Sequence, residues 1–298
     1  MTSLMESTSI DHHDDQHAEE GPMCSLRGYV PILLALLILG FPSTGSAQWL
    51  VYDNFDGGLV NPEKWWGFVA TGGPSSPSTD INRAISDGKL VLAMTQWGRN
   101  DSNAGAITGS NSLIVTNPTD IMGMEAEVSM KGAVAEGCPA NPAAVAQARV
   151  RMLASFFNDG TSGGSGDRTG DIVADIETGL DAVEGHVIRA VRFRCSDFSC
   201  VGGNDIVIAT FLTTWAINKP HIMRIVWDPA HNKFVYTVIP QTGVEEILEI
   251  LYSYADALPT GGKFAELQVR LVAPKCTGSR KKASLEFETN YVSILPAL

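Results

Sequence analysis

Asp171-Ile172-Val173-Ala174-Asp175-Ile176-Glu177 is the segment of this chain that is most informative about its secondary structure. Every second side chain in it is small or branched and apolar, and three carboxylic acids fall among the positions between. In a β-strand, successive side chains point to opposite faces of the sheet. The stretch therefore predicts a strand that covers a core with one face and presents on the other Asp171, Val173, Asp175 and Glu177.

The same period of two recurs along the chain in short runs that Gly, Pro, Asn and Asp residues separate. The runs are Lys89–Thr95, Met122–Met130, Ala148–Phe157, Asp171–Glu177, Val187–Arg194, Ile206–Thr213, His221–Trp227, Lys233–Ile239, Ala265–Val272 and Ala283–Ile294. Many strands with turn signals between them predict an all-β sandwich or barrel. Only Val244–Ala257 has helix-like spacing, and it predicts either a short helix or another pair of strands.

The chain begins with a segment that is typical of a secretory signal peptide. Tyr29–Phe41 is almost wholly apolar, Arg27 precedes it, and small residues ending at Ala47 follow. A membrane span would need about 18 to 20 apolar residues, so cleavage after Ala47 is favoured over a retained anchor. We therefore expect residues 1–47 to be an N-terminal extension and signal peptide, and residues 48–298 to be one secreted domain, extracellular or periplasmic.

The residues before Met23 do not resemble the start of a signal peptide. They are polar and acidic, whereas that region is usually positively charged. Met23 is therefore the expected start of the natural protein. The histidines at positions 12, 13 and 17, which could otherwise be taken for a metal-binding tract, are then a leader or an extension.

The composition is that of a globular protein and argues against one class of partner. Of 298 residues, 44% are hydrophobic and 18% charged, and the formal net charge is -12. Nucleic-acid binding needs clustered Lys and Arg that displace counterions from phosphate. The one basic run, Arg280-Lys281-Lys282, follows turn residues and is interpreted as a solvated turn, so no nucleic-acid partner is expected.

Four cysteines remain after the expected cleavage, and their even number favours two disulfides in an oxidising compartment. They are Cys138, Cys195, Cys200 and Cys276. Cys195 and Cys200 are close enough in sequence to close a hairpin, which would leave the other two as a pair, but three pairings are open. No Cys-x-x-Cys pair occurs, so zinc is not expected.

Several segments, taken in order, resemble the concanavalin A-like lectin and glucanase superfamily, in particular laminarinase-type family 16 glycoside hydrolases and laminin G-like modules. The segments are Tyr52–Gly57 with Pro62–Trp65, Ser86–Leu92, His221–Asp228 and Asn290–Ile294. The resemblance covers nearly the whole expected mature chain. It implies a two-sheet antiparallel jelly-roll sandwich whose concave face holds an extended carbohydrate.

The enzymes of this superfamily place Glu-x-Asp-x-Glu on one central strand. On that motif, Asp175 takes the middle position and Glu177 the acid/base position, but Val173 stands where the nucleophile should be. A valine cannot attack an anomeric carbon. Asp171 cannot replace it, because it lies about 13 Å from Asp175 along the strand. Standard double displacement is therefore not expected.

Three interpretations of these carboxyl groups remain. Asp175 and Glu177 are side chains on a solvated strand face, or they accept hydrogen bonds from sugar hydroxyls in a groove that does not cleave. In the third, Glu177 works with a carboxylate from another strand at an inverting spacing of about 6.5 to 9.5 Å. The candidates for that second carboxylate are Glu125, Glu127 and Asp181.

Aromatic and arginine side chains complete the candidate ligand site. Aromatic faces stack on the apolar side of sugar rings, and Trp97 and Trp215 are the candidates because each lies at a strand end beside polar residues, although both also suit a core. Trp65 and Trp227 are assigned to the core. Arginines could donate to sugar hydroxyls, pair with the carboxylates or simply face solvent; they are Arg149, Arg151, Arg189, Arg192 and Arg194.

Members of the superfamily often carry a structural calcium ion, and the resemblance implies where its ligands would lie. They would be Asp56 or Asp53, the carbonyl of Gly88 and Asn290. Calcium accepts amide oxygens, but an asparagine in place of the usual aspartate lowers the charge of the site. No other cofactor is expected.

These observations favour a secreted, non-catalytic carbohydrate-binding or surface-interaction module whose partner is a polysaccharide or glycan surface. One alternative is a glycoside hydrolase or lyase that acts on β-glucan-like polysaccharide through Glu177 and Asp175. Another is a structural protein of the cell envelope, in which the sandwich presents loops.

Overall fold

The computed structural model describes residues 48–71, 79–100, 105–116, 121–164, 166–200, 202–257 and 263–297. The expected signal peptide and the histidines before it lie outside these residues. Within the described ranges, no helix is long and apolar enough to cross a membrane.

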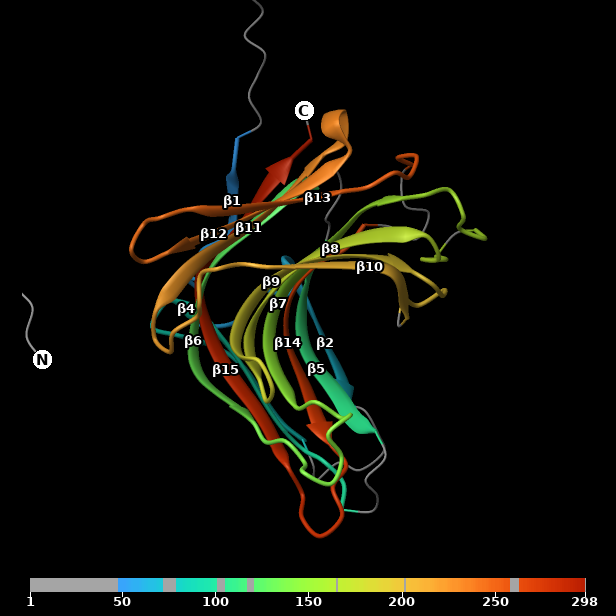
Figure 1. Cartoon of the computed structure of the whole chain (residues 1–298). Helices are drawn as coiled ribbons and strands as arrows, with labels where there is room; N and C mark the ends of the chain where they lie inside the picture. The colour runs from blue at the N-terminus through green and yellow to red at the C-terminus, as the bar shows by residue number, and fades with distance from the viewer. Residues whose placement is uncertain are drawn as a thin grey trace, which may run out of the picture. The chain divides into compact units, whose positions relative to one another are not determined.

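In the part of the chain that the structure describes, fifteen strands form two antiparallel sheets, and a single turn of 3-10 helix, Pro229–His231, follows β11 (Figure 1). The first sheet has the spatial order β13 (Glu246–Leu251), β12 (Lys233–Pro240), β11 (Pro220–Asp228), β6 (Ile121–Ala135), β15 (Lys282–Pro296), β4 (Lys89–Trp97), β3 (Thr79–Ser86), with β1 (Leu50–Asp53) also paired to β15.

The second sheet has seven strands, and Figure 1 shows its middle strands curving together. In spatial order they are β10 (Gly203–Thr210), β9 (Gly185–Cys195), β8 (Asp171–Asp181), β7 (Gln147–Asn158), β14 (Ala265–Pro274), β5 (Ala106–Val115) and β2 (Trp65–Thr71). Strands far apart in the sequence are neighbours here, because β14 lies between β7 and β5.

The larger of the two hydrophobic clusters among the described residues lies between the sheets. Met124 and Phe287 enter it from the first sheet, and Met152 and Ile176 enter it from the second, all with no exposed surface. Alternation along each strand supplies these side chains, and burying them is the main favourable contribution to folding. The prediction of an all-β, two-sheet antiparallel jelly-roll sandwich is confirmed.

Five strands lie outside the predicted runs, and β5 shows why. Its sequence contains Gly109-Ser110-Asn111-Ser112, residues that are typical of turns. Asn111 is nevertheless fully buried, and its side-chain amide donates at 3.0 Å to the carbonyls of both Asn82 on β3 and Ala93 on β4, strands of the other sheet. Val244–Ala257, for which the spacing left helix or strands open, contains strand β13.

Two disulfides connect the four cysteines. Cys138 bonds Cys276 and joins the connection after β6 to the one after β14, while Cys195 bonds Cys200 at the end of β9. Of the three pairings that the sequence left open, this is the one in which the close pair closes a hairpin.

Candidate functional site

A groove of about 450 Å³ crosses the face of the second sheet that points away from the core. Residues of all seven strands line it, from Ala70 on β2 to Ile208 on β10. We call this the groove face. Its size falls within the roughly 300 to 1,000 Å³ that is usual for ligand sites. The segment Asp171–Glu177 lies at the centre of the groove, since Asp175 and Glu177 are both lining residues.

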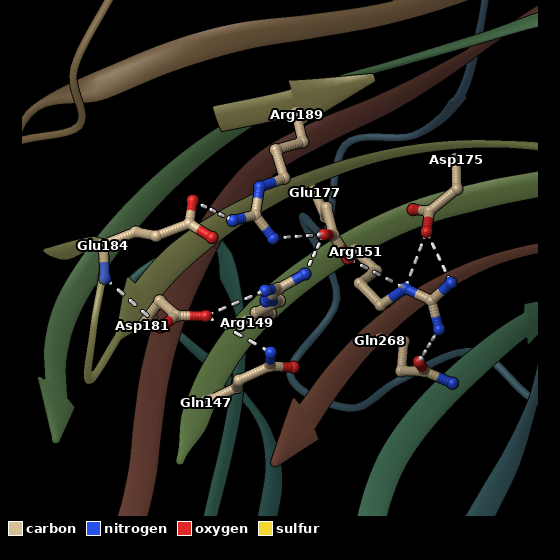
Figure 2. A network of polar contacts seen from close by, with 9 residues as sticks. All are labelled: Gln147, Arg149, Arg151, Asp175, Glu177, Asp181, Glu184, Arg189 and Gln268. Carbon is tan, nitrogen blue, oxygen red and sulfur yellow. Dashed lines mark hydrogen bonds and ion pairs between the residues drawn. The ribbon is translucent and has the colours of Figure 1, made fainter. Parts of the chain in front are cut away.

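Glu177 is surrounded by guanidinium groups in the middle of the groove face (Figure 2). Its Oε1 contacts Arg149 directly and lies 3.8 Å from Nη1 of Arg189, and its Oε2 lies 3.7 Å from Nε of Arg151. Only 4% of Glu177 is exposed. Three positive groups around one buried carboxylate compensate the charge that burial would otherwise make unfavourable.

The network extends to both sides of Glu177. Nε of Arg151 donates to Asp175 at 2.8 Å, and Nη1 of the same guanidinium donates to Gln268 at 3.1 Å. On the other side, Arg149 donates to Asp181 at 3.2 Å, and Gln147 donates to the same carboxylate oxygen at 3.2 Å (Figure 2). The interpretation of Asp175 and Glu177 as solvated side chains is therefore wrong, since Asp175 has no exposed surface.

The register between β7 and β8 produces this arrangement. Arg151 lies directly opposite Glu177, while Arg149 lies opposite Gly179. Without a side chain at Gly179, the guanidinium of Arg149 can reach both Glu177 and Asp181, which flank the glycine on the same face. A Cβ atom at 179 would collide with the carbonyl of Ala148, so glycine also permits the close approach of the two strands.

Two carboxyl groups on this face titrate nearer to neutrality than usual. Burial raises the pKa of Asp175 to about 6, although Arg151 opposes the shift. Burial also raises the pKa of Glu266, a neighbour on β14, to about 7 against the opposing influence of Arg151 and Arg168. Both groups therefore change charge within a range of pH that proteins commonly meet.

The pKa of Glu266 predicts a pH dependence of stability. Because the folded state binds this proton more tightly than the unfolded state, the free energy of unfolding rises as the pH falls through 7. Relative to Glu266→Gln, the wild type should gain about 2 to 3 kcal/mol between pH 8 and pH 5. Urea denaturation at several pH values measures the difference. The exposed Glu286→Gln is the control, and parallel curves for wild type and Glu266→Gln would contradict the prediction.

Two exposed aromatic side chains lie on β2, on the same face as the lining residue Ala70. Trp66 and Phe68 are 59% and 45% exposed, and their ring centroids lie 6.0 Å apart. They share a face with Ala70 because strand residues two apart point the same way. Neither residue was predicted from the sequence. Because Trp65 was assigned to the core, alternation along a strand would have placed Trp66 and Phe68 on the opposite face.

The other aromatic candidates lie elsewhere. Trp215 is only 3% exposed, packs in the core and stacks on His221 with ring centroids 4.2 Å apart. Trp97 ends β4 in the first sheet, where Nζ of Lys282 lies 6.0 Å from its ring centroid. Neither residue lines the groove. Trp65 and Trp227, which were assigned to the core, pack there.

Arg192 and Asp171 lie outside the groove as well. Arg192 is on the opposite face of β9 from Arg189, where it pairs with Asp205 at 3.1 Å. Asp171 begins β8 on the groove side but accepts a hydrogen bond from Asn158 at 2.8 Å and lies 3.5 Å from Nε of Arg168. Of the predicted ligand-binding residues, the groove brings together Arg151, Asp175 and Glu177.

Two of the three candidates for a second carboxylate belong to the other sheet. Glu125 and Glu127 lie on β6, where Glu125 pairs with Arg224 and Glu127 accepts a hydrogen bond from Asn290. Asp181 was expected on another strand from Glu177, and this is wrong, because both residues lie on β8 and on the same face of it. Arg149 bridges the two carboxylates.

The residues implied for calcium already have protein partners. Asp53 accepts hydrogen bonds from Nε1 of Trp65 at 2.7 Å and from the backbone of Phe55 at 3.1 Å, and Asn54 donates to Asp56. Gly88 forms the turn between β3 and β4 with a φ of 69°. Among the described residues, no cluster of three or more His, Cys, Asp or Glu is arranged to hold a metal ion. The calcium site stays a prediction.

The chain was compared with protein-family models, curated proteins and solved structures, and only solved structures are similar to it. No protein-family model matches the chain, and no curated protein matches it. Among solved structures, the laminarinase catalytic domain from Thermotoga maritima is similar at 14% identity, covering 84% of this chain and 99% of that one, with a TM-score of 0.47. A beta-1,3-glucanase from Mycobacterium marinum is also 14% identical, with the same coverage of 84% and 99% and a TM-score of 0.41.

A lectin, I-B4 from Griffonia simplicifolia, is 13% identical and covers 85% of this chain and 100% of that one, with a TM-score of 0.39. The two antiparallel sheets described above have the arrangement that the resemblance of the sequence implies. At these identities the likeness concerns the fold alone.

Proposed function

We propose that the groove face binds carbohydrate without cleaving it, as in a lectin. The observation that carries this proposal is a single groove in which fixed donors and acceptors lie beside apolar side chains. Ile206 and Ile208, each more than half exposed, line it on β10, and the exposed Trp66 and Phe68 lie on β2 on the same face as the lining residue Ala70. The buried ion pairs around Glu177 lie between them.

This combination suits the chemistry of a sugar. Hydroxyl groups both donate and accept hydrogen bonds, and the groove offers guanidinium donors, carboxylate acceptors and the amide of Gln268. Indole and phenyl faces cover the apolar side of a pyranose ring with little loss of side-chain freedom. Because the ion pairs already hold the polar groups in place, a ligand meets a site that needs little reordering.

The arrangement of carboxyl groups supports binding over hydrolysis. Retaining hydrolysis needs two free carboxyl groups about 5 to 5.5 Å apart. Val173 occupies the position of the nucleophile and packs with Leu153 and Cys195. Glu177 and Asp181 are both engaged by Arg149.

We infer that this binding takes place outside the cytosol. The expected signal peptide motivates the inference, and the two disulfides support it, since such bonds persist mainly in oxidising compartments. Its partner would then be an extracellular polysaccharide or a glycan surface.

A glycan array and a reducing-sugar assay on the purified protein test the proposal together. Binding to at least one polysaccharide with no release of reducing ends is the expected result. Turnover that is lost in Glu177→Gln but kept in Glu184→Gln would replace the proposal with the glycoside hydrolase alternative. Absence of binding across the array would leave the structural envelope protein as the better reading.

Trp66→Ala and Phe68→Ala should each weaken polysaccharide binding about tenfold, because each removes a stacking face worth roughly 1.4 kcal/mol. Both side chains are exposed, so the variants should fold normally. Trp97→Ala, which alters the first sheet, is the matched control and should bind like the wild type. Isothermal titration calorimetry measures all three, and unchanged affinity for both β2 variants would place the ligand elsewhere.

A further inference from the structure

Arg270 lies in the groove beside a second arginine, a position that does not favour the stability of the sheet. It lies on β14 directly opposite Arg149 on β7, and both side chains line the groove. Opposed residues on antiparallel strands have Cβ atoms about 4.5 to 5.5 Å apart, and like charges there destabilise the sheet. Burial and the neighbouring Arg151 lower the pKa of Arg270, and Glu177 and Asp175 offset this shift only in part.

The other arginines of the groove face differ from Arg270 in having carboxylate partners. Arg149 contacts Glu177 and Asp181, Arg151 contacts Asp175, and Arg189 contacts Glu184. Within the described residues, Arg270 forms no ion pair and its side chain makes no hydrogen bond. A guanidinium carries five N–H donors, so Arg270 retains unused capacity inside the groove.

The space around Arg270 is suited to a ligand. On its other side lies Ser110 of β5, followed by Ala70 of β2, and beyond Arg149 lies Gly179 of β8. These small side chains leave the two arginines as the large groups of their row. Ser110 and the nearby Thr108 both line the groove, and their hydroxyl groups can donate to an anion beside the guanidinium.

The ion pairs of the groove face do not include Arg270. Asp175 pairs with Arg151, Glu177 and Asp181 share Arg149, and Glu184 pairs with Arg189. Burial raises the pKa of Glu266 to about 7, so this neighbour is partly uncharged at neutral pH. Arg270 is therefore the guanidinium of this face whose N–H donors a ligand can engage.

We propose that Arg270 binds the anionic group of an acidic polysaccharide, a uronic-acid carboxylate or a sulfate ester. The proposal rests on the proposed function of the groove face as a carbohydrate site. Guanidinium binds carboxylate and sulfate through paired, charge-assisted hydrogen bonds, which are roughly twice as strong as neutral ones. A neutral sugar offers only hydroxyl groups and would give the guanidinium of Arg270 no direct anionic partner.

The test measures binding of the purified protein to three polymers in low salt by affinity electrophoresis and calorimetry. Polygalacturonate carries carboxylates, dextran sulfate carries sulfate esters, and laminarin is neutral. We expect the wild type to bind one of the acidic polymers more tightly than laminarin, with an affinity that falls as salt is added. The acidic polymer that binds identifies the anion.

Arg270→Gln should lose at least about tenfold in affinity for that acidic polymer and change affinity for laminarin less than about twofold. Arg280→Gln removes the same charge from an exposed turn outside the groove and should bind like the wild type. Because the substitution at 270 relieves a like-charge pair, the melting temperature of Arg270→Gln should equal or exceed that of the wild type.

Other outcomes separate this inference from the function on which it rests. Equal binding of laminarin and acidic polymers, unaffected by Arg270→Gln, would overturn the anionic ligand and leave carbohydrate binding standing. Equal losses for all three polymers would also overturn it, because Arg270 would then bind hydroxyl groups. A lower melting temperature in Arg270→Gln would make the residue structural. Absence of binding to any polysaccharide, on the glycan array as well as here, would remove both proposals.

Discussion

Glu177→Gln is expected to lower the free energy of unfolding by about 3 kcal/mol, because it leaves buried guanidinium groups without their shared carboxylate. Arg149 keeps Asp181 as a partner, but Arg149 is only 6% exposed and loses its direct contact with Glu177. Removing one member of a buried ion pair lowers stability far more than replacing both members by well-packed apolar residues. Equilibrium denaturation in urea measures the loss.

Glu184→Gln is the matched control, since Glu184 also pairs with an arginine of the groove face but is 53% exposed. It should lower the free energy of unfolding by less than about 1 kcal/mol. In the double variant Arg149→Met with Glu177→Gln, the loss should be smaller than the sum of the single losses. If Glu177→Gln were no more harmful than Glu184→Gln, the buried network would not contribute to stability in the way described.

Replacing Cys138 and Cys276 by serine is expected to lower the free energy of unfolding by about 5 kcal/mol. The bond closes a loop of 138 residues, and a longer closed loop removes more conformational entropy from the unfolded chain. It also joins connections that follow β6 and β14, strands of different sheets. Thermal and urea denaturation of the double variant, without reductant, measure the loss.

The other disulfide provides the comparison. Cys195 and Cys200 are separated by 5 positions, so replacing both by serine should lower the free energy of unfolding by only about 2 kcal/mol. Both variants remove two sulfur atoms and one covalent bond, and only the loop length differs greatly. A similar loss for both pairs would mean that local packing, and not the unfolded chain, determines their effect.

The strands that the sequence predicted best are those with one apolar face and no turn residues. Asp171–Glu177 was predicted and lies within β8, and the same holds for the central strands β7, β9 and β14. β5 was not predicted because its polar residues are typical of a turn. In the folded chain, Asn111 donates hydrogen bonds to carbonyls on β3 and β4. Those partners come from distant parts of the chain, and local sequence does not reveal them.

The candidate site was predictable in part. The alternation of side chains along a strand predicts that the acidic residues of β8 share one face. The same alternation places Arg189 and Arg192 on opposite faces of β9, although both were predicted as candidates for one groove. Which arginine meets which carboxylate depends on the register of β7 against β8 and on the insertion of β14 beside β7. Such non-local pairings do not follow from the alternation within any one strand.

The path of the groove decides which part of a polymer it would hold. It runs from β2 to β10, and these are the two outermost strands of their sheet. Seven strands at the usual spacing span about 29 Å, so a long chain could lie across the whole sheet and continue past either border. Recognition would then fall on internal segments in preference to chain termini, and oligosaccharides should bind more tightly with each added unit until that width is filled.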